Sequence, residues 1–193
     1  MVEDPTSTHL NPDMQGVVLT TAARQQKTLD DLIKLHSGFP MQEQKSRTEI
    51  AIGSVQGEEL MAKAIDYAFS DAVRQQDMTS LLGTISASSL EGRDAIWAML
   101  QNKWSFWQNF KGSFIFLNLF RKFICMVGRM LNNAIARFDT AEKADEIEKY
   151  FNDNPIETAR RAVSQALETV RLKAKWLERD GDDIRQFLSQ YKQ

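Results

Sequence analysis

Apolar residues recur at steps of three and four along most of the chain, the spacing of one face of an α-helix. The clearest such faces are Leu60–Ala64–Ala68, Trp97–Leu100–Trp104–Trp107, Ala144–Ile147–Phe151 and Ala159–Val163–Ala166–Val170–Leu177. Gly181 interrupts the last stripe before Ile184, Phe187 and Leu188 continue it. No alternating strand pattern bounded by hairpin turns is present. The pattern therefore predicts about eight helices and an all-α fold.

Prolines and capping residues suggest where these helices begin. No proline occurs between residues 41 and 154, so the commonest helix breaker is missing from the middle of the chain. Asn11–Pro12 and Asn154–Pro155 each combine an N-cap residue with a proline suited to the first helical position. Asp139 with Glu142 resembles a capping box. We expect helices to begin at these three places.

The remaining segments complete the predicted organisation. Residues Met41 to Ile52 are mostly polar, with Glu43/Arg47 and Lys45/Glu49 four apart, and favour an exposed helix. Short loops are expected at Ser37 to Pro40 and at Ser86 to Ser89. Successive helix pairs favour stacked αα-hairpins in a HEAT-like or armadillo-like superhelix. Residues 1–10 are expected to be a disordered arm, and residues 11–193 one domain.

Composition excludes several classes of protein. The 193 residues are 42% hydrophobic and 26% charged, with a formal net charge of −2, which favours a globular chain and gives no basic surplus for nucleic acid. One cysteine and two histidines are too few for a disulfide framework or a typical zinc domain. Phe114 to Val127 is apolar but too short for a membrane span. The start of the chain lacks a secretory pattern, and we expect a cytoplasmic protein with no membrane partner.

The residues that could carry catalysis are few. Neither histidine begins an HExxH zinc motif, and His36 is most simply the partner of a helix C-terminus. Cys125 lies in an apolar run, where a thiol behaves as a small hydrophobe. The adjacent acids Glu58/Glu59 and Asp182/Asp183 point in different directions on a helix. These residues predict no catalytic site.

Six strings, in order, resemble one known domain. They are DDLIKLH (30–36), MQEQKSR (41–47), IAIGSVQ (50–56), AFSDAVRQQD (68–77), GRDAIWAMLQNKW (92–104) and KWLERDGDDIRQFL (175–188). Together they resemble the C-terminal helical domain of zinc aminopeptidases, with the puromycin-sensitive branch as the most similar. The resemblance implies a superhelical bowl that closes over a separate catalytic domain and contacts peptide substrates. It also implies that zinc and every catalytic residue belong to that other domain, so no catalytic or metal-binding residue is expected here.

The resemblance leaves two questions open within the chain. The stretch from Gly112 to Phe138 is longer than the family pattern, so either GSFIFLNL or GRMLNNAIARF is additional, and Phe114 to Val127 is either a surplus insertion or part of the core. The candidate contact residues are Arg74, Gln76 and Asp77 in the predicted loop Val73 to Asp77. Asp77 could simply cap the following helix, or the three side chains could fix helix pairs or face the peptide chamber. The alternative function is a free-standing helical-repeat module that binds a protein or peptide.

Overall fold

All regular structure in the described part of the chain is α-helical, as the periodicity predicted. The computed structural model describes residues 11–25, 28–105, 117–155 and 159–191, with the backbone alone for residues 12 and 117–125. The helices are α1 (Pro12–Ala23), α2 (Leu29–Gly38), α3 (Gln42–Ile52), α4 (Glu58–Ala68), α5 (Gln75–Ser88), α6 (Leu90–Asn102), α8 (Leu117–Ile135), α9 (Ala141–Asp153) and α10 (Arg160–Ser189). None of the described helices is long and apolar enough to cross a membrane. The expected disordered arm, residues 1–10, lies outside the described residues.

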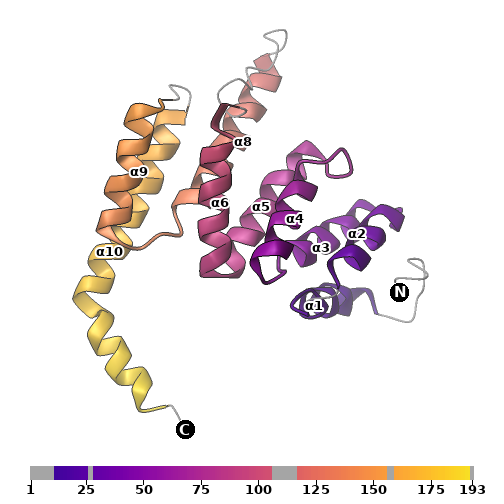
Figure 1. The fold of residues 1–193 in the computed structure, drawn as a ribbon, viewed down its shortest axis with the longest axis horizontal. Coiled ribbons are helices and arrows are strands. Elements are labelled where there is room, and N and C mark those ends of the chain that lie inside the picture. Colours follow the sequence, from indigo (N-terminus) through magenta and orange to yellow (C-terminus); the bar gives the residue numbers. More distant parts are fainter. Residues whose placement is uncertain (1–10, 26–27, 106–116, 156–158, 192–193) are drawn as a thin grey trace. The chain divides into compact units, whose positions relative to one another are not determined.

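The chain forms two compact units, Met1–Lys103 and Trp104–Gln193. In the first unit α3 packs on α1, α2 and α5, and α5 packs on α4 and α6 (Figure 1). Helices therefore contact neighbours both one and two places away in the sequence. The buried face of α5 and α6 includes Leu81, Leu82, Ile85, Ile96 and Leu100. The predicted apolar face of Trp97 and Leu100 is confirmed as core.

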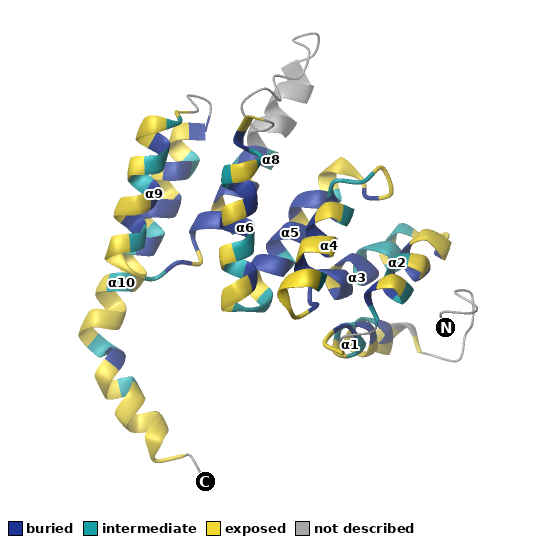
Figure 2. Ribbon diagram, viewed as in Figure 1, coloured by how far each residue is buried: buried dark blue, intermediate teal, exposed yellow. Residues whose placement is uncertain are grey.

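The second unit is built around the long helix α10. Helices α8 and α9 both pack on its N-terminal part, and the dark blue positions in Figure 2 lie along these contacts. Trp104, also buried, makes edge-to-face contacts with Phe151 at 5.2 Å and Tyr150 at 5.7 Å between ring centroids. Such aromatic pairs are favourable beyond the area that they bury. Trp104, part of the predicted apolar face, therefore anchors α9 in this unit; Trp107 lies outside the described residues.

The three predicted helix starts have different outcomes. Asn11 is the N-cap of α1, because its side chain accepts a hydrogen bond from the Asp13 amide at 3.0 Å. At α9 the cap is Thr140 rather than Asp139, since the Thr140 hydroxyl accepts from the Lys143 amide. Asn154 ends α9 instead of starting the next helix, and its side-chain amide donates to the Tyr150 carbonyl at 3.0 Å. The first helix start is confirmed, the second is displaced by one residue, and the third is wrong.

Several element boundaries also differ from expectation. Gly181 does not interrupt α10, which runs for 30 residues through it. The segment Ser86 to Ser89 is not a loop, because α5 continues to Ser88 and Ser89 alone joins it to α6. Helix α8 begins at Leu117 and continues through Val127, which is buried. The side chains before Met126 lie outside the described part of this segment, so whether it is surplus or core stays open.

Candidate functional site

The candidate residues Arg74, Gln76 and Asp77 lie at a helix start. Arg74 is the N-cap residue of α5, so Gln76 and Asp77 belong to the first helical turn, and the predicted loop ends earlier than expected. The Arg74 Nε donates to Asp77 Oδ2 at 2.6 Å, and Gln42 Nε2 donates to the same oxygen at 3.2 Å. The structure thus brings Arg74 and Asp77 together, while Gln76 is exposed beside them.

This arrangement gives Asp77 a role in joining two helices. Its carboxylate lies in the first turn of α5, where negative charge interacts favourably with the helix dipole. Gln42 is the first residue of α3, so the hydrogen bond connects the starts of α3 and α5. The Asp77 side chain is only 18% exposed, whereas that of Arg74 is 49% exposed. Sequence reasoning missed Gln42, because a contact 35 residues away leaves no local signal.

A second polar cluster, formed by His36, Glu49 and Tyr67, is buried between three helices. His36 Nε2 lies 2.9 Å from Glu49 Oε1, and the Tyr67 hydroxyl lies 2.7 Å from His36 Nδ1. The side chains of His36 and Glu49 are 1% and 5% exposed. The expectation that Lys45 and Glu49 lie on an exposed helix is therefore wrong at Glu49, although Glu43 and Arg47 do pair at 2.6 Å.

The chemistry of the three groups determines the direction of these hydrogen bonds. An ionised carboxylate only accepts, so the imidazole Nε2 donates to Glu49 and, in a neutral histidine, Nδ1 accepts from the Tyr67 hydroxyl. Burial raises the pKa of Tyr67, which keeps its phenol protonated and able to donate. The predicted position of His36 in the last turn of α2 is confirmed, but its partners are side chains from α3 and α4.

These polar residues do not form a metal centre. Zinc sites in proteins need three or four nitrogen, sulfur or carboxylate ligands. In the described ranges no group of three or more His, Cys, Asp or Glu side chains is placed to hold a metal ion. The pair His36–Glu49 offers two ligands, and its third neighbour is a protonated phenol. The donor set therefore does not fit a zinc ion, and the pair acts as a structural link.

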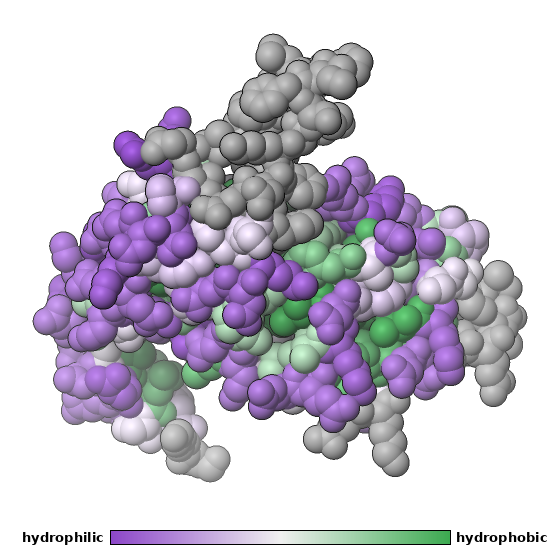
Figure 3. Space-filling model, turned by 45° about the horizontal axis from the view of Figure 1, so that its top comes forward, coloured by the Kyte–Doolittle hydropathy of each residue, from purple (hydrophilic) through white to green (hydrophobic). Residues whose placement is uncertain are grey.

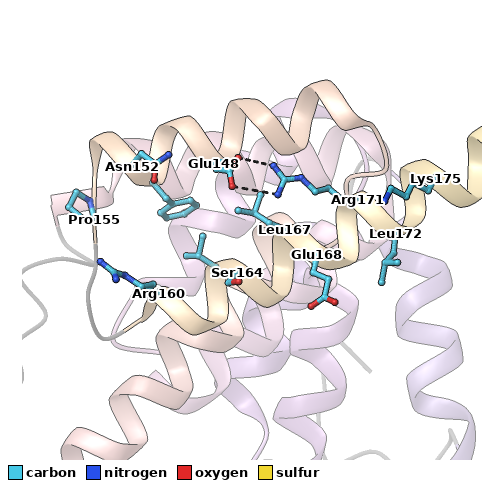
Figure 4. Close-up of a pocket in the computed structure, with 12 residues that line it drawn as sticks. Glu148, Asn152, Pro155, Arg160, Ser164, Leu167, Glu168, Arg171, Leu172 and Lys175 are labelled. Atoms are coloured by element: carbon cyan, nitrogen blue, oxygen red, sulfur yellow. Dashed lines mark hydrogen bonds and ion pairs between the residues drawn. The ribbon is translucent and has the colours of Figure 1, made fainter.

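The second unit contains an open groove of about 920 Å³ between α9 and α10 (Figure 4). Its floor includes Phe151 and Leu167. Arg171 crosses the groove and donates to Glu148 at 2.7 Å, as the dashed lines show. The hydrogen bonds to Glu148 and Asp145 raise the pKa of Arg171, so it stays charged. The groove thus combines an apolar floor with a rim of both charges.

The first unit contains a groove of about 1010 Å³ between α4 and α6. Its floor is apolar and includes Met61, Ile65, Ala95 and Met99. Its rim carries the acidic residues Glu58, Asp66, Glu91 and Asp94. The basic residue that lines it, Lys103, has its ammonium 4.7 Å above the ring of Phe69. This groove suits a ligand with apolar and basic groups.

Comparison with known families defines the class of this chain. The family model described as ERAP1-like C-terminal domain matches residues 1–172. That match includes most of the chain, and the all-α architecture agrees with it. The chain therefore belongs to the ERAP1-like C-terminal domain family, and the predicted resemblance is confirmed.

The similar curated proteins are aminopeptidases from plants and yeast. Aminopeptidase M1-B of Oryza sativa subsp. japonica is 29% identical over 186 residues, which are 92% of this chain and 19% of that protein. Aminopeptidase M1 of Arabidopsis thaliana is 26% identical over 83% of this chain and 17% of its own length. Aminopeptidase 2, mitochondrial, of Saccharomyces cerevisiae (strain ATCC 204508 / S288c) is 22% identical over 92% of this chain and 18% of its own length. The chain thus spans about a fifth of the length of these relatives.

Proposed function

We propose that this chain is the helical wall of the peptide-binding chamber in an aminopeptidase whose catalytic half is a separate region of polypeptide. The observation that carries the proposal is the family match, together with relatives that are named aminopeptidases. The chain itself supplies shape and contacts. Removal of an N-terminal residue by a zinc-activated water would be the work of the catalytic half.

The helix packing supports a superhelical wall. In the first unit, contacts between helices one and two places apart in the sequence are those of stacked helix pairs, in which each repeat rests on its neighbours. The two open grooves offer apolar floors with charged rims, which suit an extended peptide or a neighbouring protein surface. We assign the enzyme to the cytoplasm, because one cysteine and the lack of Asn-x-Ser/Thr sequences fit a reducing compartment.

Replacing the matching part of Oryza Aminopeptidase M1-B with this chain tests the proposal. The chimera should cleave aminoacyl fluorogenic substrates and longer peptides, whereas the chain alone should show no turnover and no stoichiometric zinc by elemental analysis. Robust hydrolysis by the isolated chain would overturn the proposal. A chamber wall should limit the length of the peptides that are cleaved. A folded chimera that retains zinc but cleaves peptides of every length at the same rate would therefore contradict this role.

The residues Arg74 and Asp77 allow a finer test in the same chimera. If they contact the peptide, Arg74→Ala and Asp77→Ala should lower turnover without changing the melting temperature. If they only fasten α5 to α3, both substitutions should lower the melting temperature and leave turnover per folded molecule unchanged. Gln76→Ala separates the two roles further, because Gln76 shares the exposed turn but lies outside the hydrogen-bonded group: it should lower turnover only if this turn contacts the peptide, and it should leave the melting temperature unchanged in either case.

The acidic groove between α4 and α6 favours a second candidate function, a free-standing module that binds a basic peptide. This function needs no catalytic half. Fluorescence anisotropy with a labelled peptide of alternating leucine and lysine distinguishes the two. Binding that is lost in Asp66→Lys, with no association between the chain and an aminopeptidase catalytic half, would favour the module.

A further inference from the structure

The long helix α10 carries an apolar residue at every seventh position. Every seventh residue from 163 to 191 is apolar: Val163, Val170, Leu177, Ile184 and Tyr191. At the two ends of this series the positions three and four further on are also apolar, at Ala166, Leu167, Phe187 and Leu188, whereas in the middle they hold Lys173, Ala174, Asp180 and Gly181. A strict repeat of seven residues makes paired α-helices wind around each other as a coiled coil. The pattern therefore favours a helical partner at both ends of α10, with a weaker apolar seam between them.

Only the first half of this stripe has a partner in the described structure. Val163, Ala166, Leu167 and Val170 are buried in the second unit, where α8 and α9 pack on α10. Beyond them the stripe reaches the surface: Leu177 is 37% exposed, Phe187 57% and Tyr191 69%. Figure 2 shows this distal half of α10 in yellow along most of its length, and Figure 3 shows hydrophobic surface beside its C-terminal end.

The exposed surface is large enough for a stable contact. We define the distal stripe as Leu172, Trp176, Leu177, Ile184, Phe187, Leu188 and Tyr191. All of these side chains except Ile184 are exposed. Six side chains exposed to this degree present about 100 Å² each, so two such stripes facing one another would bury about 1,200 Å², the lower bound for specific interfaces. The rings of Phe187 and Tyr191 lie in contact, 5.1 Å between centroids, so this end of the stripe is a joined aromatic surface.

The charges beside the stripe favour a second copy of the same helix as the partner. Residues 172–179 contain the bases Lys173, Lys175 and Arg179 and one acid, whereas residues 180–191 contain the acids Asp180, Asp182 and Asp183 and one base. The two segments therefore have formal charges of opposite sign. An antiparallel pair of α10 helices places the basic segment of each copy on the acidic segment of the other, while a parallel pair opposes like charges.

The ion pairs already present along α10 do not prevent these charges from pairing across a dimer interface. Arg179 pairs with Asp180 and Arg185 with Asp182 along the exposed helix surface. Pairs of this kind contribute little in water and exchange readily for partners across an interface.

We propose that the distal half of α10, residues 172–191, is a homodimer interface in which two copies of this chain pair antiparallel through the distal stripe. The proposal does not depend on the aminopeptidase function, because it concerns the chain by itself.

Sedimentation velocity of the full 193-residue chain over a wide concentration range tests the proposal. The wild-type chain should pass from monomer to dimer, and Leu177→Glu with Phe187→Glu should raise the dissociation constant at least about tenfold, since two carboxylates would be placed in the apolar contact. Both side chains are exposed in the monomer, so far-UV circular dichroism should be unchanged. The matched control, Ile50→Glu with Leu90→Glu, changes exposed apolar residues of the first unit and should leave the dimer intact.

Charge reversal tests the pairing of the two segments. Lys175→Glu with Arg179→Glu, and separately Asp182→Lys with Asp183→Lys, should each weaken the homodimer, and an equimolar mixture of the two variants should associate again. A wild-type chain that stays monomeric, or a dimer that persists in Leu177→Glu with Phe187→Glu, would overturn the proposal. A third result would also overturn the proposal: a monomer whose distal stripe is protected from proteolysis only when an aminopeptidase catalytic half is added. In that case the catalytic half, and not a second copy of this chain, would cover the stripe.

Discussion

Removing His36 should destabilise the first unit far more than its size suggests. In His36→Leu the Glu49 carboxylate, with its side chain only 5% exposed, loses the imidazole that lies 2.9 Å away. Loss of one partner from a buried ion or hydrogen-bonded pair costs about 3–5 kcal/mol, because the remaining charge has no compensation. That is a large share of the about 5–15 kcal/mol that usually separates a folded domain from its unfolded state.

A double-mutant cycle isolates this interaction. Glu49→Leu alone should also be costly, because it leaves the His36 Nε2–H without an acceptor, while His36→Leu with Glu49→Leu removes both polar groups. The double variant should therefore cost at least about 1.5 kcal/mol less than the sum of the two single variants. The free energies of unfolding come from urea titrations followed by circular dichroism, with amide exchange in α2 and α3 as the local measurement.

The control is the exposed pair Glu43–Arg47 on α3. Its atoms are 2.6 Å apart, yet the Glu43 side chain is 73% exposed, so Glu43→Leu should change stability by less than about 1 kcal/mol. If His36→Leu costs no more than Glu43→Leu, or if the His36 and Glu49 substitutions are additive, the hydrogen bond between His36 and Glu49 does not stabilise the first unit.

Two further predictions concern packing and pH. A Cβ at Gly92 would lie 2.2 Å from the Ile85 carbonyl oxygen, so Gly92→Ala should lower the free energy of unfolding by about 1–3 kcal/mol, whereas Gly16→Ala, with open space around it, should raise it slightly. Burial raises the pKa of Tyr67 and Tyr150, so the unfolded chain loses these protons first and stability should fall as pH rises above about 10. Urea midpoints measured against pH check this, and Tyr150→Phe should make the fall shallower; an unchanged slope would contradict it.

Local signals were enough to predict the helical class and much of the core. The helical spacing of Trp97 and Leu100 identified a buried face because one side of a helix must be apolar wherever it packs. Asn11 was predicted correctly as a cap because the next residue, a proline, suits the first helical position. At α9 two neighbouring side chains, Asp139 and Thr140, could both serve as caps, and residue types alone do not decide at which of them the helix begins.

The features that sequence reasoning missed depend on contacts between helices. Glu49 has the polarity of a surface residue, and only its contact with His36, 13 positions earlier, explains its burial. Gly181 was expected to interrupt the apolar stripe, and α10 runs through it without a break, because the loss of helix propensity at one glycine, about 1 kcal/mol, is too small to end a long helix. For the candidate site, the sequence identified Arg74 and Asp77 but could not show that Gln42 completes the group.

The short connection between α5 and α6 limits how the first unit can move. Ser89 is the single residue between the two helices, and its side chain accepts from the Gly92 amide at 2.9 Å. The close approach of Gly92 to the Ile85 carbonyl leaves no space for the helices to slide or tilt against one another. The connection between α5 and α6 is therefore a poor place for a hinge, and the two helices should move as one rigid body in any motion of the first unit.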